Sequence, residues 1–330
     1  MNRSSVPPPV TMVLEAADAW LPARMAAVEE RLRALVDGHG EALVEDAAAT
    51  LVAGGKRLRP LLVLLSAGAG AGAAAIRAAT AIELVHMATL VHDDVLDAAP
   101  LRRGRPTVVA RAGRKRALSV GDLLFSRAFA ELGTEGAEPQ VKLLSKASVA
   151  LALGELTQRR DAFDSTLARE RYLRRCELKT ARLFECACLI GRTGPGAPDC
   201  EGQEDALATF GLQIGLAFQL LDDVLDVTGP RERTGKARGT DLLDGTVTLP
   251  MILARERDPS LADIDLRGLD EVAAEAACDR IAATGALEAV RSEARGRVDA
   301  AKQALGGSAL DGDHRRLLEL VADGVVERYS

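Results

Sequence analysis

Apolar residues recur at the spacing of amphipathic helices along most of this chain. The pattern predicts helices over four long segments, residues 14–36, 41–52, 73–97 and 139–163. Two further helices are predicted after residue 117 and around the sequence ELKTARLFECACLIG, and three or four amphipathic ones follow residue 247. These last helices carry no chemical motif, so we expect them to form the outer wall of a bundle. Residues 1–11 contain three consecutive prolines and are expected to be a loose tail.

Composition agrees with a large helical core. Hydrophobic residues make up 48% of the chain and aromatic residues only 3%, so leucine, alanine and valine must fill the interior. We find no linker and expect a single domain over residues 1–330. The net charge of −6 argues against a nucleic-acid-binding protein, which would be basic. Five cysteines, no signal-peptide pattern and no apolar run long enough to span a bilayer indicate a cytoplasmic protein that is not an integral membrane protein.

The segment 86–103 ends an apolar run with a group of charged side chains. They are His86, Asp93, Asp94, Asp97, Arg102 and Arg103. Asp93 and Asp97 lie one helical turn apart and therefore share a face. Carboxylates this close repel one another, and a hard divalent cation such as Mg²⁺ relieves that repulsion, while the arginines are suited to bind phosphate. One such motif alone would be explained more readily as a solvated acidic helix end.

A second copy of the same motif changes this interpretation. Asp222, Asp223 and Asp226 repeat the letters DDVLD, and this second copy begins 129 residues after the first (222 − 93 = 129). Gln219 precedes Asp223 by one turn and joins that face. Two apolar helices that end in the same acidic motif are hard to explain as surface chemistry. We therefore predict two carboxylate faces opposed across a helical bundle with metal ions between them.

Several polar residues lie where an anionic substrate would need them. The sequence GGKRLRP at 54–60 places cations beside a glycine pair at the start of a helix, which is a plausible anion cradle. Lys179 and Thr180 interrupt a hydrophobic helix, and a lysine is rarely buried without an anionic partner. Glu155 and Gln158 are expected to face a polar cavity. The GKxxG around Lys236 lacks the spacing of a nucleotide-binding P-loop.

Together these motifs resemble the trans-isoprenyl diphosphate synthases, or polyprenyl synthetases. The matching segments are GGKRLRP at 54–60, HDDVLD and LRRGRPT within 92–107, GDLLFSRAF at 121–129, GELTQ at 154–158, ELKTARLFE at 177–185, FQLLDDVLD at 218–226 and GKARGTDLLDGTVTLP at 235–250. The resemblance implies an all-α isoprenoid synthase helical bundle with a central active-site cavity, normally a homodimer. It also implies condensation of isopentenyl diphosphate with an allylic diphosphate.

The resemblance carries roles to the matching positions of this chain. The residues implied to bind isopentenyl diphosphate are Lys56, Arg59, His86 and Arg103. Those implied to hold the allylic diphosphate are Arg102, Lys179, Gln219 and Lys236, with Thr180 beside them. The implied metal ligands, for up to three Mg²⁺ ions, come from Asp93, Asp94, Asp97, Asp222, Asp223 and Asp226. Of these residues, Asp93, Asp97, Asp222, Lys179 and Lys236 are expected to carry the catalysis.

Two features bear on how this chain departs from its family. The family usually has lysine where this chain has Thr246, which removes a phosphate contact unless a neighbour such as Arg238 replaces it. Short-chain members often place an aromatic floor at the positions occupied here by Ala88 and Thr89. Because both are small, the resemblance favours a product of C20 or longer, with Phe125 or Phe129 as a deeper floor.

Two alternatives remain. A class I terpene cyclase would share the fold and the first motif, but it generally lacks the second DDxxD motif and the cationic GGKR segment. A non-catalytic partner subunit of a heterodimeric synthase would be consistent with Thr246, yet such subunits tend to lose the aspartates that this chain keeps.

Overall fold

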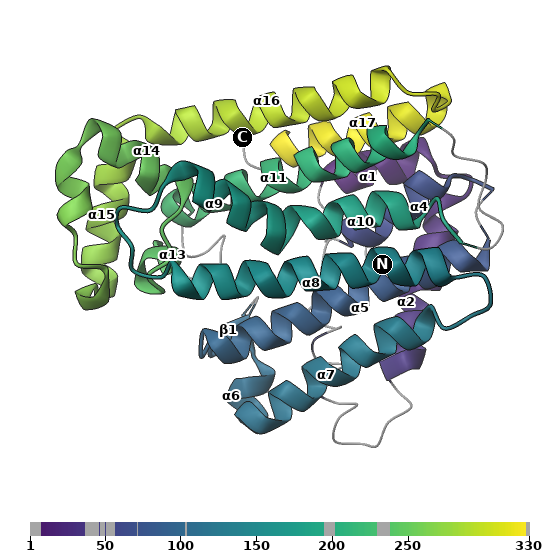
Figure 1. The fold of residues 1–330 in the computed structure, drawn as a ribbon, viewed down its shortest axis with the longest axis horizontal. Coiled ribbons are helices and arrows are strands. Elements are labelled where there is room, and N and C mark those ends of the chain that lie inside the picture. The colour runs from purple at the N-terminus through teal and green to yellow at the C-terminus, as the bar shows by residue number, and fades with distance from the viewer. Residues whose placement is uncertain are drawn as a thin grey trace.

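The computed structural model describes residues 8–36, 46, 50, 57–70, 72–102, 104–194, 202–229 and 238–327. Within these residues the protein is a bundle of α-helices with one short hairpin, β1 (Leu101–Arg102) paired with β2 (Arg105–Pro106) (Figure 1). The helices of the first half are α1 Pro8–Ala16, α2 Leu21–Val36, α4 Leu58–Ala67, α5 Ala73–Leu96, α6 Val108–Ala112, α7 Arg114–Glu131 and α8 Glu138–Arg160. The second half contains α9 Arg169–Cys176, the π-helical turn η2 Glu177–Ala181, α10 Arg182–Ile190, α11 Glu204–Thr228, α13 Thr240–Leu243, α14 Leu249–Arg257, the 3₁₀ turns η3 Pro259–Asp263 and η4 Leu266–Gly268, α15 Glu271–Ala283, α16 Ala286–Gly306 and α17 Gly312–Glu327. The predicted all-α fold is confirmed.

The long helices lie roughly side by side and enclose a shared hydrophobic core (Figure 1). In this view α8 crosses the front of the bundle, α7 lies below it and α16 lies above. Helices α10 and α11 pack on each other in the interior, and the C-terminal helices α14 to α17 cover the outside, as the sequence predicted. The largest fully buried side chains include Tyr172, Phe184 and Phe210, so the few aromatic residues are concentrated inside.

Helix α5, which ends in the first acidic motif, is apolar on most sides because it lies inside the bundle. By length and composition it is the one described helix that could cross a membrane, which the sequence analysis did not expect. However, 67% of its most apolar window is buried against other helices. A helix covered on all sides by protein needs no polar face, and this is a sufficient reason for its composition.

Two glycines let other helices approach the π-helical turn closely. A Cβ atom on Gly154 of α8 would lie 2.6 Å from the backbone nitrogen of Lys179, and one on Gly215 of α11 would lie 2.6 Å from the Cα of Ala181. Because those neighbours are backbone atoms, no side chain fits at either glycine without moving the turn. The turn that carries Lys179 and Thr180 is therefore held between α8 and α11. Single π turns within α-helices are frequent at functional sites.

The structure corrects some predicted boundaries. The first helical region is two helices, α1 and α2, and α1 begins at Pro8, so residues 8–11 are helical rather than a loose tail. The helix predicted at 41–52 lies outside the described residues except for Asp46 and Thr50. The hairpin formed by β1 and β2 and the π turn were not predicted, since neither leaves a signal in hydrophobic periodicity.

Candidate active site

A polar pocket of about 440 Å³ lies where the two acidic motifs meet. The carboxylates that line it are Asp97, Asp222, Asp223, Asp226, Asp241 and Asp244. The cations that line it are Arg102, Arg159, Arg175 and Lys179. These side chains come from the C-terminal ends of α5, α8 and α11, from β1, and from α9, η2 and α13 with the turn after it. The pocket therefore brings the last aspartate of the first motif to all three aspartates of the second, while Asp93 and Asp94 are not among the residues that line it.

In the first motif, cations hold the carboxylates. The buried carboxylate of Asp94 accepts a hydrogen bond from Nε of Arg102 at 2.7 Å. Asp97, which caps the C-terminal end of α5, accepts one from the guanidinium of Arg159 at 2.7 Å. Burial raises the pKa of Asp93 to about 6, although the nearby cation Lys179 opposes this shift.

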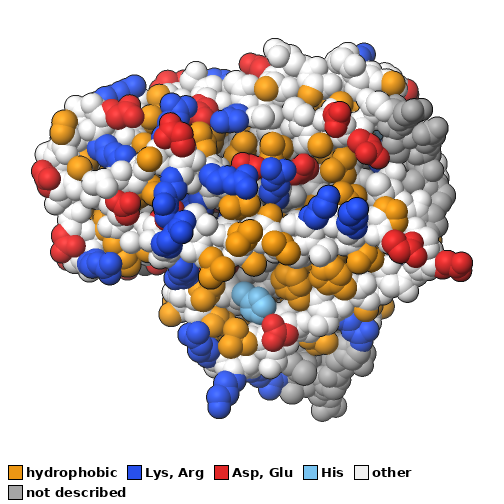
Figure 2. Space-filling view, in the orientation of Figure 1, with side chains coloured by type: hydrophobic (Ala, Val, Ile, Leu, Met, Phe, Trp, Pro, Cys, Tyr) orange, Lys and Arg blue, Asp and Glu red, His pale blue; other side chains and the backbone are white. Residues whose placement is uncertain are grey.

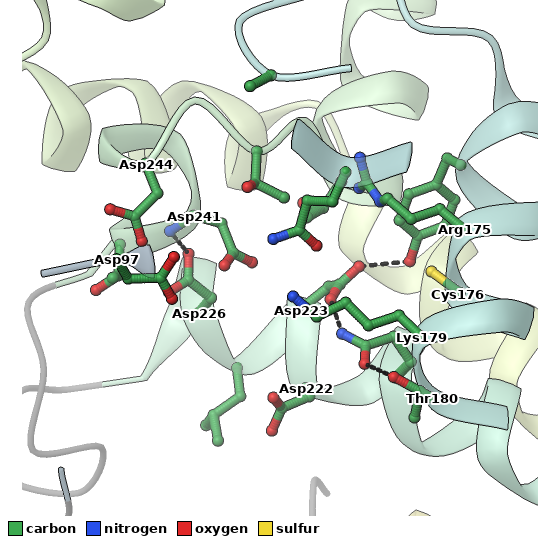
Figure 3. Close-up of a pocket in the computed structure, with 18 of the residues that line it drawn as sticks. Asp97, Arg175, Cys176, Lys179, Thr180, Asp222, Asp223, Asp226, Asp241 and Asp244 are labelled. Atoms are coloured by element: carbon green, nitrogen blue, oxygen red, sulfur yellow. Dashed lines mark hydrogen bonds between the residues drawn. The ribbon is translucent and has the colours of Figure 1, made fainter. Parts of the chain in front are cut away.

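In the second motif, neutral groups hold the central carboxylate. Asp223 is buried, and its Oδ2 accepts a hydrogen bond from the hydroxyl of Tyr172. Its Oδ1 accepts one from the amide of Gln219 at 2.8 Å, and the Gln219 carbonyl oxygen accepts one from the Thr180 hydroxyl at 2.7 Å (Figure 3). Burial raises the pKa of Asp223 to about 8, and the charge of Asp241 adds to the increase.

The end of the second motif is tied to the loop that follows it. The Asp226 carboxylate accepts a hydrogen bond from the backbone N–H of Asp241 at 3.2 Å, and the Asp226 carbonyl accepts one from Gly239 at 3.0 Å. Figure 3 shows Asp226, Asp241 and Asp244 on the same side of the pocket as Asp97, which belongs to the first motif. This loop therefore brings two further carboxylates to the point where the motifs meet.

Lys179 has the anionic partner that its position predicted. Its Nζ lies 2.5 Å from Oε2 of Glu155 on α8. Burial works against the charge of Lys179, but the carboxylates of Asp93 and Glu155 outweigh it and raise the pKa of Lys179. The other oxygen of Glu155 accepts a hydrogen bond from Nε of Arg159 at 2.9 Å. Glu155 thus holds two cations side by side at the edge of the pocket.

The residues expected to bind isopentenyl diphosphate are only partly described. Lys56 and Arg103 lie outside the described residues, as does Lys236, which was assigned to the allylic diphosphate. His86 lies two turns before Asp93 on α5 and is not among the residues that line the polar pocket. Arg59 packs its guanidinium 4.5 Å from the centre of the Phe184 ring.

Arg59 and Arg57 differ in what they contact. Burial lowers the pKa of Arg59 to about 10, and its buried Nε has no hydrogen-bond partner among the described residues. Arg57 instead forms ion pairs with Glu29 at 2.5 Å and with the buried Glu83 at 2.7 Å. A buried guanidinium N–H without an acceptor is suited to bind an anionic ligand. Arg57 is satisfied by protein carboxylates, which is consistent with a structural role.

The residues expected to limit chain length lie away from the polar pocket. Ala88 is fully buried in α5, and Thr89 donates a hydrogen bond to the His86 carbonyl at 2.8 Å. On α7, the rings of Phe125 and Phe129 stack with centroids 6.4 Å apart, and His92 stacks on Phe125 at 6.5 Å. The effect of these residues on product length stays a prediction.

The pocket is compatible with magnesium although no complete metal cage is formed. Among the described residues, no three potential ligands from His, Cys, Asp and Glu lie close enough to hold one ion. Magnesium is usually bound through one or two carboxylates, with substrate phosphates and water completing its shell. Carboxylates whose pKa values are raised by burial, as those of Asp93 and Asp223 are, gain most from a nearby dication. The residues present therefore fit Mg²⁺ delivered together with a diphosphate.

Sequence reasoning missed four residues of this site. They are Tyr172, Arg159, Arg175 and Asp244. Asp244 stands three residues after Asp241, so the acidic spacing in DLLDG is a signal that would have found it. Tyr172, Arg159 and Arg175 lie in ordinary helical sequence and leave no such signal, because only the packing of α8, α9 and α11 brings them to the aspartates.

Comparison with known proteins identifies close similarity over most of the chain. Residues 41–278 match the family model described as polyprenyl synthetase. The chain is 40% identical over 281 residues to heptaprenyl diphosphate synthase component 2 of Geobacillus stearothermophilus, covering 84% of this chain and 87% of that protein.

Two solved structures are similar in both fold and sequence. A decaprenyl diphosphate synthase from Rhodobacter capsulatus gives a TM-score of 0.85 at 35% identity and covers 97% of this chain and 99% of its own. A polyprenyl synthase from Caulobacter crescentus CB15, complexed with calcium and isoprenyl diphosphate, also gives a TM-score of 0.85 at 35% identity and covers 97% and 98%.

Proposed function

The chain belongs to the polyprenyl synthetase family and is a trans-prenyltransferase that makes a polyprenyl diphosphate, and we propose that the polar pocket between its two acidic motifs is where the reaction occurs. The reaction joins isopentenyl diphosphate to an allylic diphosphate and gives a product of C20 or longer. The observation that carries this proposal is the meeting of Asp97, from the first motif, with all three aspartates of the second motif and Lys179 in one pocket. A terpene cyclase would not need the second motif, and a non-catalytic subunit would not need to keep either.

We propose that the metal ligands are Asp93, Asp97 and Asp222, with Asp226 contributing from the second motif. Members of this family depend on Mg²⁺, and up to three ions are expected here. When bound, the metal neutralises charge on the departing diphosphate. Asp94 and Asp223 are buried and bonded to protein side chains, which supports a role in positioning their motifs.

The protein's own residues supply binding and orientation. Lys179 and Arg102, together with Lys236, would bind the allylic diphosphate and stabilise the charge that develops as the allylic C–O bond breaks. Thr180 and Gln219 hold Asp223 in place beside them. The residues proposed to bind isopentenyl diphosphate are Lys56, Arg59, His86 and Arg103.

The apolar interior explains why no nucleophile is required. Helix α5 and its neighbours form a buried wall of alanine, valine and leucine next to the pocket. Such a wall keeps water from the allylic cation until the double bond of isopentenyl diphosphate attacks it. A proton is then lost, for which the departed diphosphate is a suitable base. We propose that residues 1–330 carry out this reaction as one isoprenoid synthase domain.

We propose that the chain is a cytoplasmic homodimer. On α8 the side chains of Val149, Leu153 and Leu156 are all exposed at helical spacing, so they form an apolar stripe on the face seen in Figure 2. A second copy that covers this stripe would remove it from water. The relative named component 2 makes a different partner subunit the competing possibility. The mass of the purified chain in solution tests the homodimer.

Product analysis tests the proposed function directly. The purified chain is supplied with Mg²⁺, isopentenyl diphosphate and, separately, C5, C10, C15 and C20 allylic primers, and the dephosphorylated prenols are sized. We expect elongation to a product of C20 or longer, and Ala88→Phe should shorten it. Cyclised hydrocarbon without elongation would identify a terpene cyclase. No turnover by the chain alone, restored by a second subunit, would identify a heteromeric synthase.

A further inference from the structure

Arg159 is a pocket cation to which the family resemblance assigns no role. It lies in the last turn of α8 and lines the polar pocket. Its guanidinium bridges two carboxylates, with 2.7 Å to Asp97 and 2.9 Å to Glu155. The neighbouring Arg160 does not line the pocket, is 70% exposed, and lies 3.9 Å from its nearest carboxylate, Asp161.

Arg159 is the most exposed of the cations that line the pocket. Its side chain is 42% exposed, against 27% for Lys179 and 25% for Arg102. Arg175 is buried, donates a hydrogen bond to the Val247 carbonyl and packs over the Tyr172 ring. An arginine at the rim can therefore turn toward a ligand without leaving a buried charge behind.

Arg159 also stands next to Lys179 in the arrangement that a phosphate requires. The two cations bind the two oxygens of one carboxylate, Glu155, at 2.9 and 2.5 Å. A phosphate group accepts hydrogen bonds through several oxygens, so Arg159 and Lys179 can bind two of its oxygens in the same way. Lys179 is already proposed to bind the allylic diphosphate, so a group bound there lies within reach of Arg159.

The cation deficit created by Thr246 points to the same residue. Thr246 lines the pocket, where the related enzymes usually have a lysine. Arg238, the neighbour first considered as a replacement, donates to Asp279 at 2.8 Å and to the Val227 carbonyl at 2.9 Å, and it does not line the pocket. Arg159 lines the same pocket as Thr246, so its guanidinium can supply the positive charge that a lysine at position 246 would offer to the diphosphate.

We propose that Arg159 is a diphosphate-binding residue. In the free enzyme its guanidinium neutralises Asp97, and when a metal ion binds Asp97 the guanidinium binds the diphosphate instead. This inference rests on the proposed function of the pocket. A dication at Asp97 competes with the Arg159 guanidinium for the same carboxylate, so metal binding releases the guanidinium. Arg159 therefore favours binding of the diphosphate and opposes binding of the metal ion.

Calorimetric titration of the purified full chain tests the proposal with two probes. The first is inorganic pyrophosphate in the presence of saturating Mg²⁺, and the second is Mg²⁺ alone. For Arg159→Gln we expect pyrophosphate affinity to fall about 10- to 100-fold, as expected for lost hydrogen bonds between charged groups. The affinity for Mg²⁺ alone should rise severalfold, because Asp97 no longer has a competing partner. The allylic KM should rise together with the loss of pyrophosphate affinity.

Two matched variants complete the experiment. Arg159→Lys keeps the charge but not the planar fork, so it should recover part of the pyrophosphate affinity. Arg160→Gln, the same change one residue away outside the pocket, should leave both affinities at the wild-type values.

Loss of both affinities in Arg159→Gln would overturn the inference and show a structural role, as would unchanged pyrophosphate affinity in an active enzyme. Wild-type protein that binds no pyrophosphate and elongates no primer would instead overturn the proposed function itself.

Discussion

The two acidic motifs have the same five letters, DDVLD, but the protein holds them in different ways. In the first, Arg102 binds the central Asp94 and Arg159 binds the final Asp97, so cations offset the carboxylates. In the second, the central carboxylate is held by the hydroxyl of Tyr172 and the amide of Gln219, as Figure 3 shows.

This difference has an electrostatic consequence. Asp223 is held by groups that carry no positive charge, and burial raises its pKa to about 8. Asp93 of the first motif lies near Lys179, and its pKa rises only to about 6. Asp93 is the first aspartate of its motif and Asp223 is the second of its own, so each pKa shift belongs to one position and its surroundings. The burial and the charged neighbours that cause both shifts come from the tertiary structure.

The largest effect is expected from substitutions at the ends of the two motifs. Asp97→Asn removes a charge that we propose holds metal, and kcat/KM should fall about 10³-fold. Asp226→Asn should cost only about tenfold, since an asparagine oxygen can still accept the hydrogen bond from the Asp241 N–H. Steady-state kinetics at saturating Mg²⁺ measure both, with the exposed Asp299→Asn as control. Equal losses would mean that the motifs are functionally equivalent.

A smaller effect is expected on stability when the partner of each central aspartate is removed. Arg102→Gln removes the guanidinium that donates to the buried Asp94 and should lower the free energy of unfolding by about 2–3 kcal/mol. Tyr172→Phe should cost about 1–2 kcal/mol, because Gln219 still donates to Asp223. Urea unfolding without metal measures both. A larger loss of unfolding free energy for Tyr172→Phe than for Arg102→Gln would contradict the interpretation that the ion pair to Asp94 contributes more to stability than the neutral hydrogen bond to Asp223.

The smallest effect is the pH dependence of stability in metal-free buffer. A carboxyl group whose pKa is raised by folding stabilises the protein at low pH, and this contribution is lost as pH rises through the folded-state pKa. The contribution of Asp93 should be lost by about pH 6 and that of Asp223 by about pH 8. Between pH 7 and 9 the wild-type unfolding temperature should thus fall by about 2 °C more than that of Asp223→Asn.

Asp93→Asn serves as the control for this last prediction, because the carboxyl group that it removes titrates below this pH range. Its unfolding temperature should fall by as much as that of the wild type between pH 7 and 9. If Asp223→Asn also kept the full decrease, the second motif would not be the source of the pH dependence.

Local sequence was a good guide to the helices and to the charged residues at their ends. Helix α5 was predicted at 73–97 and spans Ala73–Leu96, and Lys179, which is half-buried, was predicted to have an anionic partner, which is Glu155. Both follow from rules that act within one helix, namely apolar periodicity and the cost of an unpaired buried charge. The separation of α1 from α2 was missed although Pro22, in the first turn of α2, signals a helix start. The π turn at Glu177–Ala181 was missed because it leaves no signal in hydrophobic periodicity.

The sequence by itself determined the helical class, the pair of acidic motifs and the family, because helical periodicity and motif spacing are properties of the chain alone. Only the tertiary structure decided which carboxylates are held by cations and which by Tyr172 and Gln219, and it alone placed Arg159 on Asp97. The physical reason is that pKa values and ion pairs depend on distance and burial in space, and residues far apart in sequence supply both.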